Sequence, residues 1–162
     1  MGRWYLIFIK NQPQISVPSL AGLVALRDLN LAHNKIQYLQ NKTHGLFEDC
    51  LSIRKIDLSH NKVAFVTRKM FPESKWIPYK LQWVDLSHNE MPVLTKELLI
   101  GTKHLRHLNV SANMLNNVRD GVISNLTGLE VLDISHNFLT DKVGPTTAAP
   151  RYDFCFLYRY LQ

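Results

Sequence analysis

Five segments of this 162-residue chain share one spacing of apolar residues and asparagine. The first segment places Leu26, Leu29, Leu31, Asn34 and Ile36 at the shared positions, and its copies begin at residues 53, 81, 105 and 129. Successive asparagines of the pattern are 27, 28, 24 and 24 residues apart. Repetition at this period predicts stacked copies of one small structural unit.

The spacing within one copy predicts a short strand. Leu29 and Leu31 are two residues apart, so both point to the same side of an extended chain while Asn30 points to the other. One such strand cannot bury its apolar side alone. The copies are therefore expected to stack, strand beside strand, into a parallel sheet.

An asparagine follows each expected strand, where the chain must turn away from the sheet. Its amide both donates and accepts hydrogen bonds, so it can satisfy backbone groups at the turn. We predict that these residues form a structural ladder along the stack: Asn34, Asn61, Asn89, Asn113 and Asn137.

The pattern resembles the leucine-rich repeat, L-x-x-L-x-L-x-x-N-x-L. The resemblance implies an α/β solenoid, or horseshoe, with a parallel sheet on its concave face and loops and short helical turns on its convex face. We divide the chain into a partial or atypical repeat (1–19), leucine-rich repeats (20–143) and a non-repeat C-terminal tail (144–162). The tail is expected to pack poorly, and the chain to be a fragment of a longer protein.

Within this class, the chain is most similar to chaoptin-like proteins, the insect photoreceptor cell-adhesion family. The similarity rests on five stretches: residues 50–63, 77–81, 92–95, 101–103 and 121–127. It implies a non-enzymatic adhesion module that is extracellular or at the cell surface, with membrane association only through parts not present in this chain. The alternatives are a fragment of a Toll-type receptor ectodomain and an intracellular leucine-rich scaffold.

Neither terminus matches a clear targeting signal. Met1 to Ile9 has the order of a signal peptide, but Lys10 interrupts its apolar core and no small-residue cleavage site follows. A strand at Leu6 to Phe8 is the preferred interpretation. The last aromatic residues are too short and interrupted for a lipid-anchor tail.

Three N-x-S/T sequons predict glycosylation sites at Asn41, Asn109 and Asn125. Asn41 and Asn125 fall on the returning half of their repeats, where a glycan is easily tolerated. Asn109 falls on a strand, pointing outward from the sheet.

Recurring Asp-x-Ser-His segments, such as Asp57 to His60, contain the residue types of a hydrolase triad. A triad needs convergent geometry at one place, so letters that recur in several repeats favour a structural role. The histidines His33, His60, His88 and His136 do not make a metal site either, since no carboxylate or cysteine completes a ligand set. We expect no enzyme, no cofactor and no metal.

A net charge of +6 suggests nucleic acid as a partner, but the outward strand positions balance basic and acidic residues. The remaining lysines, among them Lys62, Lys80 and Lys103, are interpreted as a scattered, solvated set. Nucleic acid is therefore not expected. Cys50 is expected to lie buried beside the second strand, with pairing to Cys155 the alternative.

The best candidate for a contact surface is the outward face of the sheet around Trp83. Aromatic residues and arginine dominate binding hot spots, and Trp83 is flanked by basic residues in the neighbouring repeats. We predict a protein partner, with homophilic binding as one form. The predicted partner-binding residues are Trp83, Arg54, Lys55, Arg106 and His107.

Overall fold

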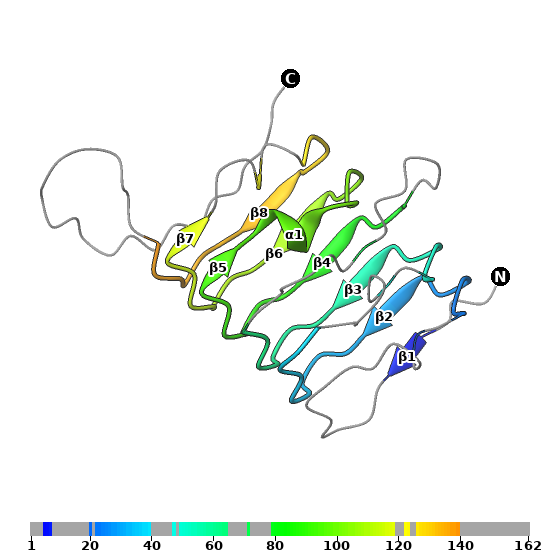
Figure 1. Ribbon diagram of the computed structural model, residues 1–162, viewed down its shortest axis with the longest axis horizontal. Helices are drawn as coiled ribbons and strands as arrows, with labels where there is room; N and C mark the ends of the chain where they lie inside the picture. Colours follow the sequence, from blue (N-terminus) through cyan, green and yellow to red (C-terminus); the bar gives the residue numbers. More distant parts are fainter. Residues whose placement is uncertain are drawn as a thin grey trace, which may run out of the picture.

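The computed structural model describes residues 5–7, 20, 22–39, 47, 49–64, 71, 79–118, 122–123 and 126–139. These residues form successive coils whose strands lie side by side, with the N-terminal coils on the right of Figure 1 and the later coils on the left. No helix in these ranges is long and apolar enough to cross a membrane.

One six-stranded parallel sheet runs through the stack in the order of the sequence, apart from the short β5 and β7. Its strands are β1 (Tyr5–Ile7), β2 (Asp28–Asn30), β3 (Lys55–Asp57), β4 (Trp83–Asp85), β6 (His107–Asn109) and β8 (Val131–Asp133). The register pairs equivalent positions of each repeat, as in Leu29 opposite Ile56 and Ile56 opposite Val84. Every repeat therefore adds the same side chains to the same columns.

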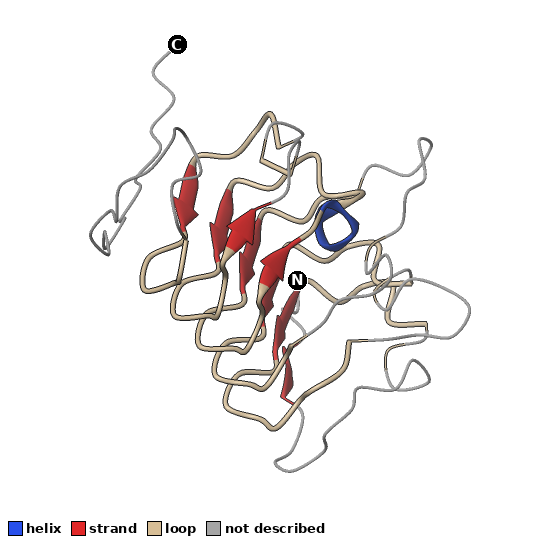
Figure 2. Ribbon diagram, turned by 60° about the vertical axis from the view of Figure 1, so that its left-hand side comes forward, coloured by secondary structure: helices blue, strands red, loops and turns tan. Residues whose placement is uncertain are grey.

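The connecting segments carry the other elements. β5 (Val93–Leu94) pairs in parallel with β7 (Asn117–Val118), and the four-residue helix α1 (Lys96–Leu99) follows β5. Figure 2 shows α1 among the returning segments, away from the main sheet. The sequence pattern marks Leu94 and Val118 as apolar anchors but does not predict this second sheet.

The core lies between the main sheet and the returning segments. Leu29 and Leu31 are buried while Asn30 is exposed, so the alternation expected from the repeat is present. In the next repeat, Ile56 and Leu58 are buried and Asp57 between them is half-buried. Burying these side chains contributes about 1.5–3 kcal/mol each, which only stacking of neighbouring coils can supply.

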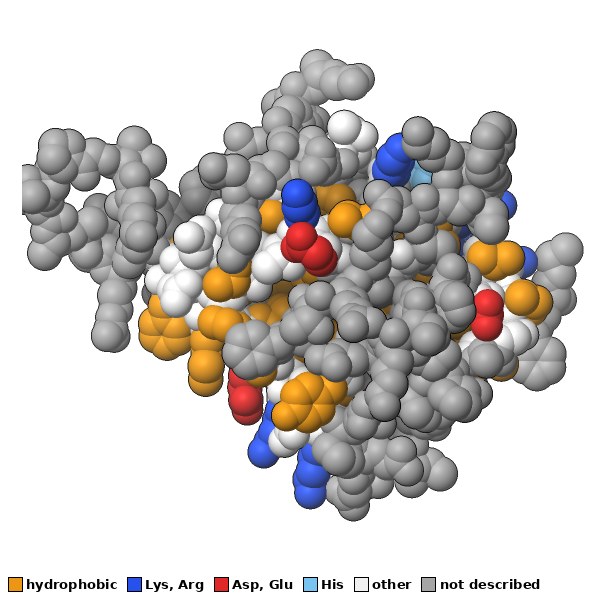
Figure 3. All heavy atoms as spheres, in the orientation of Figure 1, with side chains coloured by type: hydrophobic (Ala, Val, Ile, Leu, Met, Phe, Trp, Pro, Cys, Tyr) orange, Lys and Arg blue, Asp and Glu red, His pale blue; other side chains and the backbone are white. Residues whose placement is uncertain are grey.

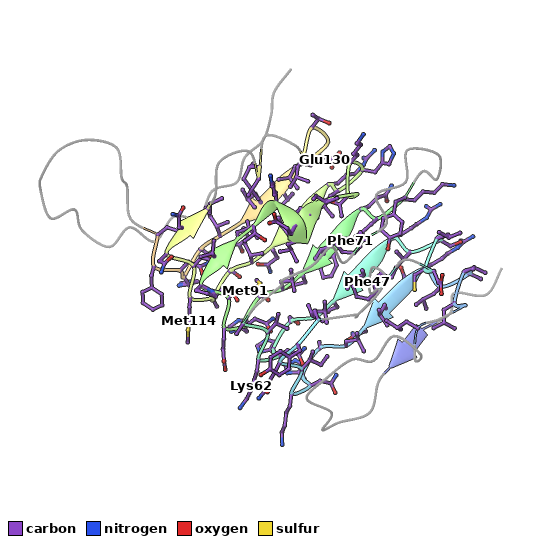
Figure 4. The ribbon with its side chains drawn as sticks, viewed as in Figure 1. Phe47, Lys62, Phe71, Met91, Met114 and Glu130 are labelled. Atoms are coloured by element: carbon purple, nitrogen blue, oxygen red, sulfur yellow. The ribbon has the colours of Figure 1, made fainter. Side chains whose placement is uncertain are left out.

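Aromatic residues fill the two longest repeats. Phe47 and Phe71 stack with ring centroids 5.5 Å apart, and Tyr79 packs on Phe71 at 5.7 Å. Figure 4 shows Phe47 and Phe71 inside the solenoid. Cys50 is a fully buried free cysteine beside this cluster, as expected from the sequence, and burial raises its thiol pKa to about 11. Cys155 lies outside the described residues.

At the N-terminal end, β1 spans Tyr5–Ile7, one residue earlier than the strand expected at Leu6 to Phe8. Its register places Leu6 opposite Leu29, which is the alignment of the repeat pattern. The remainder of the segment 1–19 and the whole tail 144–162 lie outside the described residues.

Candidate protein-binding surface

The turn after each strand is built around the repeated asparagine. In Asn89, Nδ2 donates to the carbonyls of Leu58, Leu86 and Ser87 at 3.0–3.1 Å, and Oδ1 accepts from the Val63 N–H at 2.9 Å. The amide thus bonds its own turn and the preceding repeat. Asn61, Asn113 and Asn137 have the same two-sided arrangement. Asn34 bonds the carbonyls of its own turn, Leu31 and Ala32.

The recurring Asp-x-Ser-His segments serve the same turn. The Asp57 carboxylate accepts from the Ser59 N–H at 3.1 Å and from the Ser59 hydroxyl at 2.7 Å. The next residue, His60, has a positive φ of 53°, a conformation that Asn, Asp and His adopt more readily than other non-glycine residues. The serine therefore donates to the aspartate as part of an Asx turn, which is a structural role for all three residue types.

Three of the turn histidines stack in a column. The ring centroids of His33 and His60 are 4.3 Å apart, and those of His60 and His88 are 4.1 Å apart. Desolvation and the neighbouring imidazoles lower the pKa of His60, against the opposing pull of Asp85 and Asp57. Within the described ranges, no group of three potential metal ligands comes together.

On the outward face of the sheet, Trp83 lies between two neighbours of the same column. The Lys55 ammonium is 4.0 Å from the Trp83 ring centroid, and the His107 ring stacks on Trp83 at 5.5 Å with an interplanar angle of 18°. Both contacts follow from the register, which pairs Lys55 with Trp83 and Trp83 with His107. We call these three residues the Trp83 stack. Trp83 and His107 are half-buried, so the indole is held in place while part of it reaches solvent.

Charge around the Trp83 stack is uneven. Two positions further along each strand, an acidic row begins with Asp57 and Asp85 and ends with Asp133. Burial lowers the pKa of His107, although Asp85 and Asp133 act in the opposite direction. Desolvation therefore favours the neutral imidazole, and Lys55 supplies the positive charge of the stack.

Asn109 interrupts the acidic row. Its Nδ2 donates to Asp85 Oδ2 at 3.2 Å, and its Oδ1 accepts from the N–H and hydroxyl of Ser111 at 3.0 and 2.7 Å. The Asn109 sequon therefore coincides with the Asx turn that three other repeats build with Asp57, Asp85 and Asp133. The other two predicted glycosylation positions, Asn41 and Asn125, lie outside the described residues.

Arg54 accepts a hydrogen bond from the Trp83 N–H at its carbonyl, at 3.0 Å, and Arg54 and Arg106 both line an open groove at the edge of the sheet where the strands begin. The Arg106 guanidinium pairs with the Glu130 carboxylate at 2.9 Å, and both side chains are more than half exposed. Lys80 and Lys103, which the sequence alone suggested were scattered, line the same groove. Both lysines are exposed, as expected of a solvated set, and stacking of the coils brings them to the same groove.

The geometry is that of a leucine-rich-repeat solenoid with a parallel sheet, the fold that the sequence predicts. A family model for the leucine rich repeat matches residues 103–145. The fold class is thereby confirmed, and leucine-rich repeats are typically protein-interaction modules without catalytic activity.

Among solved structures, the chain is similar to a leucine-rich repeat protein of Leptospira interrogans, with a TM-score of 0.58 and 26% sequence identity. The match covers 74% of this chain but only 28% of the other. No significant match was found among curated proteins.

Proposed function

We propose that this chain is a protein-binding module that presents the outward face of its sheet, centred on the Trp83 stack, to a protein partner. The observation that supports it is the position of Trp83, a half-buried indole fixed between Lys55 at 4.0 Å and His107 at 5.5 Å. A pre-ordered aromatic side chain contributes contact area at little conformational cost, which is typical of binding hot spots.

The stack also limits the kind of ligand. Lys55 covers one part of the indole and His107 stacks on it, so a planar base or sugar ring would have to displace one of them. A protein partner can instead contact the exposed indole edge and bond the neighbouring acidic row. Aromatic and charged groups side by side favour a protein interface with an apolar centre and a polar rim.

The setting we propose is contact between cell surfaces. The resemblance of residues 50–63 and 121–127 to chaoptin-like adhesion proteins supports an extracellular or cell-surface location, with homophilic binding as one form. A Toll-type receptor ectodomain and an intracellular scaffold remain the alternative settings for the same surface.

The test uses the chain as a bivalent, fluorescently labelled probe on intact cells. We expect binding that is abolished when proteases first strip the cell surface, because the partner is a protein. We expect Trp83→Ala to weaken the binding by about 2 kcal/mol or more, as for a central hot spot.

The matched control is Phe138→Ala, which removes an aromatic side chain that is 61% exposed in a turn rather than on the outward sheet face. It should bind like the parent. Equal binding by the parent and Trp83→Ala would refute the proposal, as would binding that survives protease treatment of the cells.

A further inference from the structure

The groove beside the outward sheet face gathers positive charge from separate repeats. Its volume is about 800 Å³, and four of its lining residues are lysine or arginine: Arg54, Lys80, Lys103 and Arg106. We call it the edge groove. In Figure 3, positively charged side chains stand out near opposite edges of the solenoid, and Figure 4 places Glu130 at the edge opposite Lys62.

The inner side of the edge groove is fixed by the sheet. The N–H of Gln82 donates to the Arg54 carbonyl at 2.9 Å, and the N–H of Arg106 donates to the Gln82 carbonyl at 2.9 Å. Because neighbouring strands are about 4.8 Å apart, the Arg54 and Arg106 backbones are separated by roughly 10 Å. Their spacing is therefore set by hydrogen bonds rather than by flexible loops.

The outer side is anchored by buried neighbours. Lys80 follows Tyr79 and precedes Leu81, both of which are buried. Lys103 follows Thr102, whose hydroxyl donates to the Leu99 carbonyl at 2.7 Å. The backbone beside both lysines is therefore held by buried neighbours, as the backbone of the two arginines is held by the sheet.

Charge in the groove is only partly compensated. Glu130 is the one carboxylate among the lining residues, and it pairs with Arg106 at 2.9 Å, so Arg54, Lys80 and Lys103 have no second carboxylate to pair with in the lining. Carboxylates bind such a set through charge-assisted hydrogen bonds, and arginine can bind them bidentately. The edge groove thus has the chemistry of an anion-binding site.

We propose that the edge groove binds a short acidic peptide segment of the partner protein. This deepens, and rests on, the proposed protein-binding function. The length of the acidic segment is limited by the acidic row on the same sheet face. That row begins three residues after Arg54, at Asp57, which is about 10 Å further along the strand. A uniformly charged polysaccharide would run from the groove onto the row of Asp57 and Asp85, where like charges repel it.

A peptide avoids this conflict because its charge can change from residue to residue. Carboxylates would occupy the groove, and neutral or cationic side chains would follow over the acidic row. Gln82 and Thr127 supply uncharged hydrogen-bonding groups in the same lining, which suits a backbone better than a sulfated chain.

The experiment measures fluorescence anisotropy of a blocked octapeptide of alternating Glu and Ser, at an ionic strength of about 0.15 M. Lys80→Gln/Lys103→Gln should raise its Kd about tenfold, because two charge-assisted contacts are lost. The matched control, Lys35→Gln/Lys62→Gln, removes the same net charge from exposed turn positions outside the groove. It should change the Kd by less than about twofold, because these charges lie beyond a Debye length.

A third variant tests whether removing a negative charge from the groove increases the affinity for the peptide. Glu130→Gln removes the carboxylate that pairs with Arg106, so it should tighten peptide binding about threefold by freeing that guanidinium. All five substituted positions are exposed, so the variants are expected to fold.

Equal loss of affinity in the two lysine pairs would overturn the proposal, because it would show only general attraction to a basic protein. A heparin octasaccharide whose binding needs Lys80 and Lys103 while peptide binding does not would also overturn it, in favour of a sulfated polysaccharide. Because this assay contains no cell-surface partner, its failure leaves the Trp83 test unaffected. Likewise, a negative result in the Trp83 test on cells does not change the outcome of the peptide assay.

Discussion

Replacing Asn89 with leucine tests the ladder that joins the repeats. The substitution leaves the buried Val63 N–H without its acceptor at 2.9 Å and removes the donor of three carbonyls at 3.0–3.1 Å. One orphaned buried group costs about 1–3 kcal/mol, and each lost hydrogen bond about 1 kcal/mol. We therefore expect the free energy of unfolding to fall by about 4–6 kcal/mol, a large fraction of the 5–15 kcal/mol typical of a domain.

Urea denaturation followed by circular dichroism measures this loss. The control is Asn116→Leu, because Asn116 is exposed and only its backbone N–H has a described hydrogen bond, to the Pro92 carbonyl. It should change the unfolding free energy by about 0.5 kcal/mol or less. If Asn89→Leu is also within about 1 kcal/mol of the parent, the ladder does not have the energetic role that its geometry indicates.

Three further outcomes are expected. The lowered pKa of His60 means that the unfolded chain binds a proton at this residue more readily than the folded chain, so stability should fall as the pH drops below 6.5. The melting temperature of His60→Asn should fall less steeply with decreasing pH than that of the parent, and equal slopes would contradict this. In a Cys155→Ser background, Cys50 should resist a thiol reagent at about pH 8 until the chain unfolds, because its pKa is about 11; rapid labelling of the native protein would contradict this. Glycopeptide mapping of protein secreted from insect cells should find Asn109 unmodified in partner-binding material, since a glycan there would crowd the Trp83 stack; a glycan at Asn109 in material whose binding still depends on Trp83 would refute this exclusion.

The sequence alone predicts the fold because the same spacing of apolar residues and asparagine occurs in five successive segments. The alternation of Leu29 with Asn30 determines which side of each strand is buried, and the spacing of the asparagines determines the stacking. Even the strand register could be predicted, since Leu6, Leu29 and Ile56 occupy equivalent positions and pair in the sheet.

The outward surface could be predicted only in part. Lys55, Trp83 and His107 share one repeat position, so their contact follows from the register, but the stacked geometry depends on side-chain conformations that the pattern does not specify. Arg54 and Arg106 are exposed, as the repeat pattern predicts, and they also line the edge groove, which the pattern does not predict.

The edge groove was missed for a physical reason. Lys80 and Lys103 lie in connecting segments of different length, outside the regular positions of the repeat, so no spacing rule aligns them with the arginines. A column-by-column alignment of residues just before each strand would have shown the basic character of Arg27, Arg54 and Arg106. The short pairing of β5 with β7 was missed similarly, because two residues are too few to give an alternation.

Oxidative footprinting with mass spectrometry tests the central claim most directly, once the cell-surface partner is in hand. Trp83 is compared with Met114 and Phe138, which are 53% and 61% exposed in turns outside the sheet. The proposed surface predicts that adding the partner lowers the oxidation rate of Trp83 and leaves those of Met114 and Phe138 unchanged. An unchanged rate at Trp83, with protection at Met114 or Phe138, would show that the partner binds elsewhere on the solenoid.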